Sequence, residues 1–178
     1  LVGIMGGRIW VESHVGKGSS FHFTVPFGMV TKHADQAKPL ERVVRKAPQA
    51  LRVLLAEDNE VNRQVAVEFL EMRGHTVQVA HNGLDALGAF EKERFDVILM
   101  DLQMPQMDGF QATASIRESE KKTGRHIPII AMTGFAMKGD RQRCLDNGMD
   151  AYICKPIRSQ ELFDVLESFS PGNKDGRA

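Results

Sequence analysis

Polar side chains follow four apolar runs of this 178-residue chain at positions where they could take part in chemistry. Glu57 and Asp58 follow the run LRVLLA, and Asp101 follows VILM. A hydroxyl, Thr133, follows IIAM, and an amine, Lys155, follows AYIC. Three carboxylates, one hydroxyl and one ammonium are groups that can bind a hard cation and receive a phosphoryl group.

Each of these residues also has an ordinary structural explanation. Asp58 could cap the helix that begins near Asn59, and Thr133 could end its strand with no further role. Lys155 could be a common surface lysine. The occurrence of all of them at the ends of alternate strands is much less expected by chance, and it favours a catalytic interpretation.

The elements that must position these residues follow from an alternating pattern between residues 50 and 169. Apolar runs predict strands over 51–56, 76–80, 95–100, 127–132 and 151–154. Helices are predicted over 60–73, 82–93, 109–121 and 138–147, with a last helix starting at 159. The predicted fold class is therefore α/β, a five-stranded parallel sheet with helices on both faces. Right-handed crossovers bring the carboxyl ends of all strands to one edge.

Two helices carry specific expectations. The first has Val61, Val65, Phe69 and Met72 on one face and ends at Gly74. In the last, Ser159 is the expected cap, and Leu162, Phe163, Leu166 and Phe169 are expected to face the core. Asn82 and Asp108 are expected to cap the second and third helices.

The three carboxylates predict a metal-dependent phosphoryl acceptor. Clustered carboxylates repel one another unless a cation lies between them, and a site made only of oxygen ligands suits Mg²⁺. Asp101 lies before a turn with Pro105 and Gly109, where it can act as a nucleophile, since aspartyl phosphates are a known covalent intermediate. Lys155 and Thr133 supply the cation and the hydrogen-bond donor that phosphoryl oxygens require.

Composition excludes several classes of protein. Hydrophobic residues make up 42% and charged residues 26% of the chain, as in soluble globular proteins. No apolar run reaches the roughly 20 residues of a membrane helix. Residues 51–169 hold 14 basic and 19 acidic residues, a net charge of −5, which argues against direct nucleic-acid binding. Cys144 and Cys154 lack metal-ligand spacing and are expected to be reduced, as in a cytoplasmic protein.

Four segments resemble the signature segments of a two-component receiver domain: AEDNEVNRQV, ILMDLQMPQMDGF, IIAMTGFAMKGDR and GMDAYICKPI. Their sequences are most similar to those of receivers carried by hybrid sensor histidine kinases, and the resemblance spans residues 51–169. It implies a flavodoxin-like strand order of 2-1-3-4-5. It also implies a phosphorelay function, in which a phosphohistidine on a kinase or phosphotransfer domain, in the same chain or in trans, donates its phosphoryl group.

The resemblance further implies a role for each site residue. Asp101 would accept the phosphoryl group, and Glu57, Asp58, Asp101 and the carbonyl of Gln103 would hold Mg²⁺. Lys155 would pair with the phosphate and Thr133 would bond to it, while Tyr152 would be the rotameric aromatic residue of the switch. The responding surface would consist of the fourth helix, the fifth strand and the fifth helix. The Lys155–Pro156 peptide bond would be cis.

Two positions are expected to tune the lifetime of the phosphoryl group. Gln103 could orient a water molecule, whereas Phe135 could either obstruct its attack or merely pack in the loop. Gly134 leaves room beside the phosphate, so Gly134→Ala is expected to slow phosphorylation by acetyl phosphate. The segment KGDRQRC at 138–144 could be an anion-binding patch, although a solvated helix face is the expectation.

Residues 1–28 resemble the end of a histidine-kinase ATPase domain, through LVGIMGGRIWVES and the predicted hairpin that ends in GKGSSFHFTVP. Residues 29–49 read as a linker, 50–169 as the receiver and 170–178 as a flexible tail. The sequence is thus expected to be a piece of a longer, possibly membrane-anchored kinase. None of its six histidines has the surroundings of a phosphodonor, so the piece is not expected to autophosphorylate.

Three other functions compete with that of a receiver. A haloacid-dehalogenase-like phosphatase needs a second Asp two residues after the nucleophile, where this chain has Gln103. A DNA-binding response regulator needs an output domain after the receiver. A pseudo-receiver that only docks partners would have lost part of the acidic and basic set, which is complete here.

Overall fold

The structure is a computed structural model that describes residues 2–3, 5–26, 47, 49–134 and 138–170, with no side-chain description for 138–140. It divides into two units, residues 1–41 and 42–178. The predicted linker and the tail after residue 170 lie almost entirely outside the described residues.

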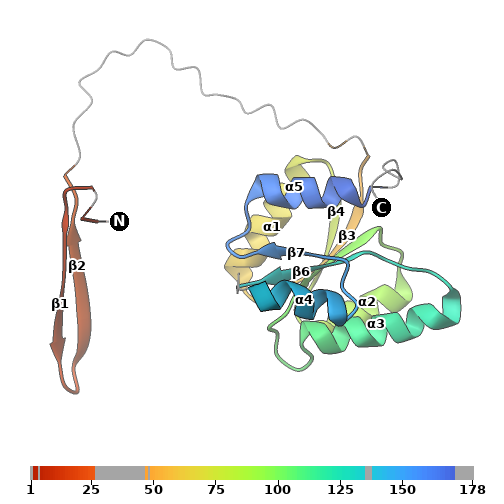
Figure 1. The fold of residues 1–178 in the computed structure, drawn as a ribbon, viewed down its shortest axis with the longest axis horizontal. Helices are drawn as coiled ribbons and strands as arrows, with labels where there is room; N and C mark the ends of the chain where they lie inside the picture. Colours follow the sequence, from red (N-terminus) through yellow and green to blue (C-terminus); the bar gives the residue numbers. More distant parts are fainter. Residues whose placement is uncertain (1, 4, 27–46, 48, 135–137, 171–178) are drawn as a thin grey trace, which may run out of the picture. The chain divides into compact units, whose positions relative to one another are not determined.

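The first unit is an antiparallel β-hairpin, as predicted (Figure 1). It consists of β1 (Arg8–His14) and β2 (Gly18–Thr24). Ile9 pairs with Phe23 and Val11 with Phe21, which puts these four apolar side chains on one face of the hairpin. All four are exposed, by 53 to 76%. Within the first unit, the hairpin therefore presents an exposed apolar face.

The second unit is built around a five-stranded parallel sheet, as predicted. Its strands are β3 (Arg52–Ala56), β4 (Thr76–Ala80), β5 (Val97–Asp101), β6 (Ile129–Thr133) and β7 (Ala151–Cys154). The order β4-β3-β5-β6-β7 is the 2-1-3-4-5 order of the flavodoxin-like fold. The third strand begins two residues later than expected and includes Asp101, so the acid is part of the strand.

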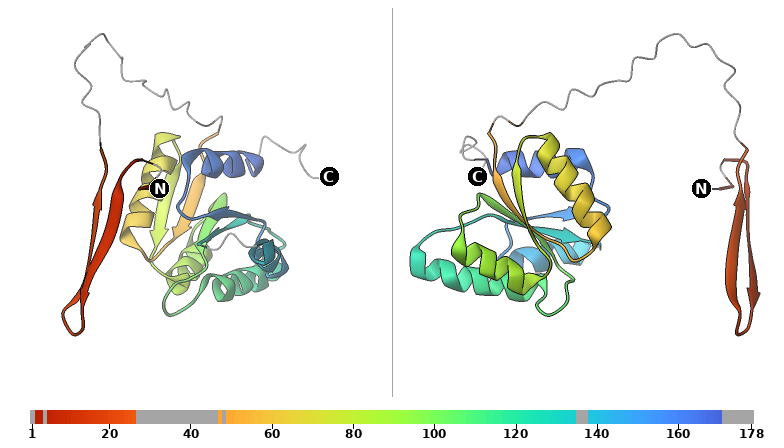
Figure 2. Two further views of the ribbon diagram at one scale, coloured as in Figure 1. Left: turned by 60° about the vertical axis from the view of Figure 1, so that its left-hand side comes forward. Right: turned by 180° about the vertical axis from the view of Figure 1, so that it is seen from behind.

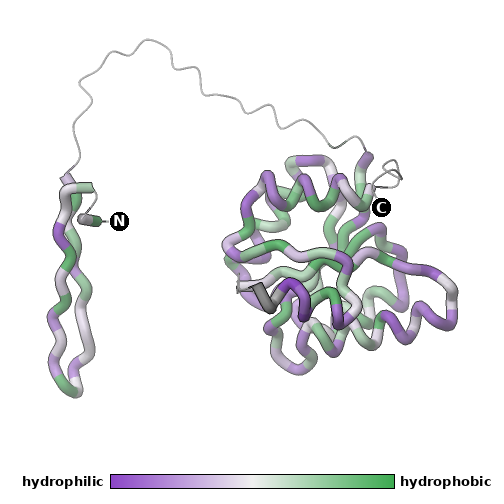
Figure 3. The backbone as a smooth tube through the Cα atoms, viewed as in Figure 1, coloured by the Kyte–Doolittle hydropathy of each residue, from purple (hydrophilic) through white to green (hydrophobic). Residues whose placement is uncertain are grey.

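Five helices cover the two faces of this sheet (Figure 2). They are α1 (Glu60–Met72), α2 (Gly83–Lys92), α3 (Gly109–Thr123), α4 (Lys138–Asp146) and α5 (Ser159–Ser168). α1 and α5 pack on one face, and α2, α3 and α4 lie on the other, so each face has its own core. Figure 3 shows hydrophobic residues concentrated in the central strands, whereas hydrophilic and hydrophobic residues alternate along the helices.

Two of the three predicted helix caps are present. The Asn82 side chain accepts the Asp85 N–H at 2.8 Å. Asp108 accepts the Gln111 N–H at 2.8 Å, and Gln111 accepts the Asp108 N–H in return, so α3 begins with a complete capping box. The prediction that Ser159 caps the last helix is wrong. Arg158 is the N-cap of α5, and its side chain forms no capping hydrogen bond.

The predicted packing face was right for α5, whereas most of the apolar row predicted for α1 is exposed. Leu162, Phe163 and Leu166 are buried, and Phe169 packs against the same core. In α1, by contrast, Ala66 and Leu70 are the buried residues. Val61 and Met72 are 70% and 54% exposed, and Val65 is exposed as well. Phe69, the fourth residue of the predicted row, packs against the core and lies edge-on to Phe163. The predicted row is therefore divided between the core and the surface.

Candidate functional site

The five predicted site residues meet at the carboxyl edge of the sheet. Glu57 and Asp58 follow β3, Asp101 ends β5, Thr133 ends β6 and Lys155 follows β7. All five line one cleft of about 460 Å³. The remaining lining residues are Asn59, Asn62, Leu102, Gln103, Asp108, Phe110, Met132, Gly134 and Arg143.

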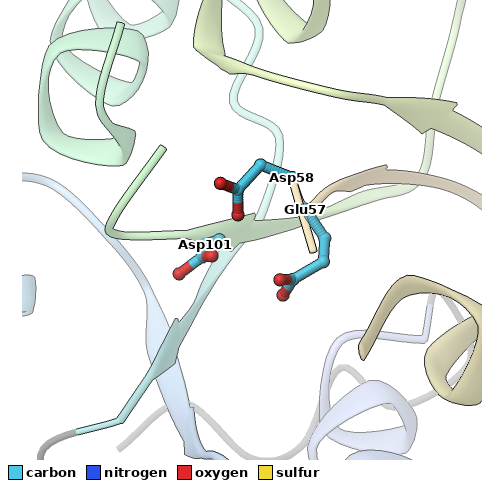
Figure 4. Close-up of side chains that lie close together, drawn as sticks. All are labelled: Glu57, Asp58 and Asp101. Carbon is cyan, nitrogen blue, oxygen red and sulfur yellow. The ribbon is translucent and has the colours of Figure 1, made fainter. Parts of the chain in front are cut away.

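The three carboxylates are close enough together to share a cation (Figure 4). One oxygen from each of Glu57, Asp58 and Asp101 lies within 4.8 Å of the others. Glu57 and Asp101 are only 1% and 5% exposed, whereas Asp58 is exposed. Oxygen ligands of this kind, with one side open to solvent, fit Mg²⁺, which binds through one or two carboxylates and retains several water molecules.

The Lys155 ammonium lies between two of these carboxylates. Its Nζ atom is 2.6 Å from Glu57 Oε2 and 2.7 Å from Asp101 Oδ2. The Lys155 backbone N–H donates to the Thr133 carbonyl at 2.7 Å, which fixes the chain after β7 against the end of β6. The Lys155–Pro156 peptide bond is cis, as the family resemblance implies. The lysine therefore balances part of the negative charge of the cleft.

Asp101 uses its two carboxylate oxygens differently. Oδ1 accepts the Gln103 backbone N–H at 3.2 Å, which is a turn interaction, while Oδ2 faces Lys155. The turn is closed by Gly109, whose N–H donates to the Leu102 carbonyl. A Cβ atom at Gly109 would lie 2.2 Å from the Asp101 carbonyl oxygen, so only glycine permits this approach. Asp101 is thus held in a fixed position with one oxygen at the centre of the cleft.

Sequence reasoning missed the residues that hold Glu57 and Asp58 in place. Asn62 Nδ2 and the Asn59 N–H donate to Glu57 Oε1 at 3.2 and 3.3 Å. Arg63 Nη1 donates to the carbonyls of Glu57 and Asp58 at 3.2 and 3.1 Å. Asn59 is the actual cap of α1, and this excludes a capping role for Asp58. The sequence did contain a signal for this arrangement. Asn59 lies at the predicted start of the helix, and Asn62 follows it three residues later.

The remaining predicted residues are placed as follows. Thr133 is buried. Tyr152 is half-buried and packs against the core, and the guanidinium carbon of Arg141 lies 5.9 Å from its ring centroid. Gln103 lines the cleft, and a Cβ atom at Gly134 would meet nothing within 4 Å. Phe135 lies outside the described residues.

Other features bear on the protein's class. Cys144 and Cys154 are both free thiols, as expected. Among the described residues, no helix is long and apolar enough to cross a membrane.

The response regulator receiver domain family matches residues 53–167. The chain belongs to this family. Hybrid signal transduction histidine kinase K of Dictyostelium discoideum is 37% identical over 174 residues, which cover 94% of this chain and 14% of that protein. The chain spans 7 to 15% of the length of the first plant and Dictyostelium histidine kinases that it matches.

Two solved receivers have the same fold. The receiver domain of a Pseudomonas aeruginosa PAO1 sensor histidine kinase, crystallised with a magnesium ion coordinated in its active-site cleft, is 40% identical with a TM-score of 0.62. The match covers 68% of this chain and 98% of that one. A chain of the Saccharomyces cerevisiae co-crystal of histidine phosphotransfer protein Ypd1 and the Ssk1 receiver is 28% identical, with a TM-score of 0.64 over 67% of this chain and 88% of that one. Residues 53–167 are a receiver domain homologous to those of hybrid histidine kinases.

Proposed function

We propose that Asp101 is the phosphoacceptor of this receiver and takes its phosphoryl group from a phosphohistidine. The observation that carries the proposal is the position of the Asp101 carboxylate, with Oδ2 2.7 Å from the Lys155 ammonium and with Glu57, Asp58 and Thr133 in the same cleft. In the reaction, the phosphorus–nitrogen bond of the donor breaks as a bond forms between phosphorus and an Asp101 oxygen. The donor ring, protonated on its other nitrogen, leaves with the electron pair as neutral imidazole.

The residues that would hold Mg²⁺ are Glu57, Asp58 and Asp101, together with the backbone carbonyl of Gln103. Bound Mg²⁺ supplies charge neutralisation on the phosphoryl oxygens. The 4.8 Å grouping of the three carboxylates supports this assignment, as does the magnesium ion in the cleft of the related Pseudomonas receiver. Lys155 supplies a second positive charge. Its ammonium group would contact the phosphoryl oxygens in place of part of its present contact with Asp101.

Thr133 and Tyr152 are the proposed switch residues. The phosphoryl group adds nearly two negative charges beside Asp101. Thr133 and Lys155 would move towards this charge, and Tyr152 would turn into the space vacated by Thr133. Phosphorylation would thereby change the relative populations of two conformational states of the surface formed by α4, β7 and α5. Gln103 and Phe135 are the positions proposed to set how long the phosphoryl group persists.

The partner is proposed to be a histidine-bearing kinase or phosphotransfer domain, in the same chain or in trans. The exposed row of Val61, Val65 and Met72 supports docking of such a partner, because α1 begins directly after the acidic pair of the cleft. The Ypd1–Ssk1 complex is an assembly of a phosphotransfer protein with a related receiver.

Residues 1–28 are proposed to be the end of a histidine-kinase ATPase domain, followed by a linker over 29–49, the receiver over 50–169 and a tail over 170–178. The division of the chain into two units supports this arrangement. So does the Dictyostelium kinase match, which extends over 94% of the chain. The exposed apolar face of the hairpin is the kind of surface that a missing part of a domain would cover.

The proposal is tested by incubating the whole chain with acetyl phosphate and Mg²⁺ and measuring phosphoryl incorporation by mass spectrometry. We expect one acid-stable, base-labile phosphoryl group, which Asp101→Asn and removal of Mg²⁺ by EDTA both abolish. Asp96→Asn is the matched control, since it removes a carboxylate at the opposite edge of the sheet, where Asp96 accepts the Arg52 N–H. A phosphoryl group that persists in Asp101→Asn would contradict the assignment, and none in the unaltered chain would favour a pseudo-receiver.

A further inference from the structure

A second cation, Arg143 of α4, borders the same cleft as Asp101. Its guanidinium carbon is 4.7 Å from the ring centroid of Phe110, the second residue of α3. A cation held by an aromatic ring keeps its full charge and its N–H donors, whereas a cation paired with a carboxylate is neutralised. Among the described side chains, which do not include those of 138–140, no carboxylate forms an ion pair with Arg143, whose guanidinium borders the cleft.

The charges that line the cleft explain why such a cation would matter. Four carboxylates line it, from Glu57, Asp58, Asp101 and Asp108, against two cations, Lys155 and Arg143. An approaching phosphoryl group is itself an anion, so the acidic lining repels it. Lys155 is already engaged at 2.6 and 2.7 Å by two of those carboxylates. Arg143 is therefore the cation in this lining that a donor can meet without first displacing a carboxylate.

We propose that Arg143, held over Phe110, is a positioning residue that contacts the phosphoryl group of the incoming donor and raises the rate of its transfer to Asp101. The inference rests on the proposed role of Asp101 as phosphoacceptor. It applies to phosphoramidates and acyl phosphates alike, since both present the same phosphoryl oxygens. A guanidinium can bind two of these oxygens at once, which orients the group as well as attracting it. Within the basic segment at 138–144, residues 141–143 are exposed, and Arg143 borders the cleft.

The test measures the second-order rate constant for phosphorylation by acetyl phosphate at saturating Mg²⁺. In this reaction the bond between phosphorus and the bridging oxygen breaks, a bond from phosphorus to Asp101 forms, and acetate leaves with the electron pair. Arg143→Gln is expected to lower the rate constant by about tenfold. This loss is smaller than the loss on removing a buried hydrogen-bond donor to a transition state, because the guanidinium is exposed to solvent. Arg143→Lys, which keeps the charge, is expected to remain within about threefold of the unaltered chain.

Three further measurements separate this role from a purely structural one. Phe110→Leu keeps an apolar side chain but removes the ring, and it is expected to lower the rate constant by about two- to fourfold, because the guanidinium is no longer held. Arg125→Gln removes one positive charge from the opposite end of the domain, after α3, and should leave the rate constant unchanged. Raising the ionic strength should bring the Arg143→Gln and unaltered rate constants together, because salt screens an exposed charge.

Two results would overturn the inference alone. One is an Arg143→Gln rate constant equal to that of the unaltered chain at low ionic strength, with Asp101→Asn still inactive. The other is a loss that stays the same at every ionic strength and that Arg143→Lys shares in full, since this would mean that Arg143 acts through packing. A phosphoryl group on Asp101→Asn would instead overturn the proposed phosphoacceptor, and the inference with it.

Discussion

At the scale of single residues, the two carboxylate oxygens of Asp101 have different partners. Oδ1 accepts the Gln103 N–H in a turn, and Oδ2 pairs with the Lys155 ammonium. Asp108, seven residues later, is a helix cap with a complete capping box. Two acids in one short stretch therefore have different surroundings: Asp108 caps a helix, and Asp101 pairs with a lysine in the cleft.

The close approach of α3 to Asp101 depends on Gly109. We expect Gly109→Ala to destabilise the domain by about 2–4 kcal/mol, because the new Cβ atom would lie 2.2 Å from the Asp101 carbonyl oxygen and backbone would have to move. Urea unfolding of the receiver measures this change. Gly88→Ala is the matched control in α2: its Cβ atom would meet nothing within 4 Å, and we expect stabilisation by about 0.5–1 kcal/mol. Equal effects at the two positions would contradict the steric explanation.

At the scale of secondary-structure elements, one arginine ties α3 to β6 and to the chain before β7. Arg117 donates to the carbonyls of Gly148 and Ile127 at 2.8 and 2.9 Å. It also pairs with Glu120 and Asp150, both at 2.7 Å. Asp150 in turn accepts the Ile129 N–H at 2.8 Å. The non-catalytic edge of the sheet therefore depends on a partly buried ionic network.

Removing Arg117 should be costly. We expect Arg117→Met to destabilise the domain by about 3–5 kcal/mol, because the Glu120 carboxylate is buried and would lose its cation. The measurement is again the free energy of unfolding in urea. Lys121→Met in the same helix breaks the exposed pair with Glu118 and should barely change that free energy. A small effect at Arg117 would indicate that His126, which also contacts Asp150 and Glu120, can take its place.

The sequence was sufficient to predict most elements and to predict that Glu57, Asp58, Asp101, Thr133 and Lys155 meet at one edge of the sheet. The strands at 76–80 and 151–154 were predicted to the residue, because alternation and turn residues mark their ends. It was not sufficient for the packing of α1, since periodicity shows that Val61, Val65 and Met72 share a face but not whether that face meets the sheet. Nor could it reveal that Lys155 bridges Glu57 and Asp101, because pairing between strand ends is a three-dimensional property.

At the scale of the whole receiver, His75 joins the start of the sheet to the end of α1. Its side chain is buried, and Nδ1 accepts the Leu51 N–H at 3.1 Å. Burial lowers the pKa of His75 below its ordinary value of 6.5, and the nearby positive charge of Arg73 lowers it further, with Glu167 opposing. The folded domain therefore holds His75 neutral at a pH where the unfolded chain binds a proton.

This difference predicts a loss of stability in mild acid. As the pH falls through 6.5, the unfolded state gains a proton that the folded state resists, so the free energy of unfolding decreases until the lowered pKa is reached. Unfolding midpoints measured between pH 8 and about pH 5 test this, before most carboxylates titrate. His75→Asn keeps an acceptor for the Leu51 N–H but cannot bind the proton, and its stability should decrease less over that range. The same slope in both proteins would contradict the role of His75.

The apolar face of the hairpin also affects how the whole chain behaves in concentrated solution. A two-stranded sheet has two open edges. Between these edges, the side chains of Ile9, Val11, Phe21 and Phe23 form an exposed apolar surface. Copies of the chain can bury these surfaces against each other by stacking or by adding strand to strand. We therefore expect the hairpin to lower the colloidal stability of the chain. A sample begun at residue 47 should remain dispersed at concentrations where the longer chain scatters light.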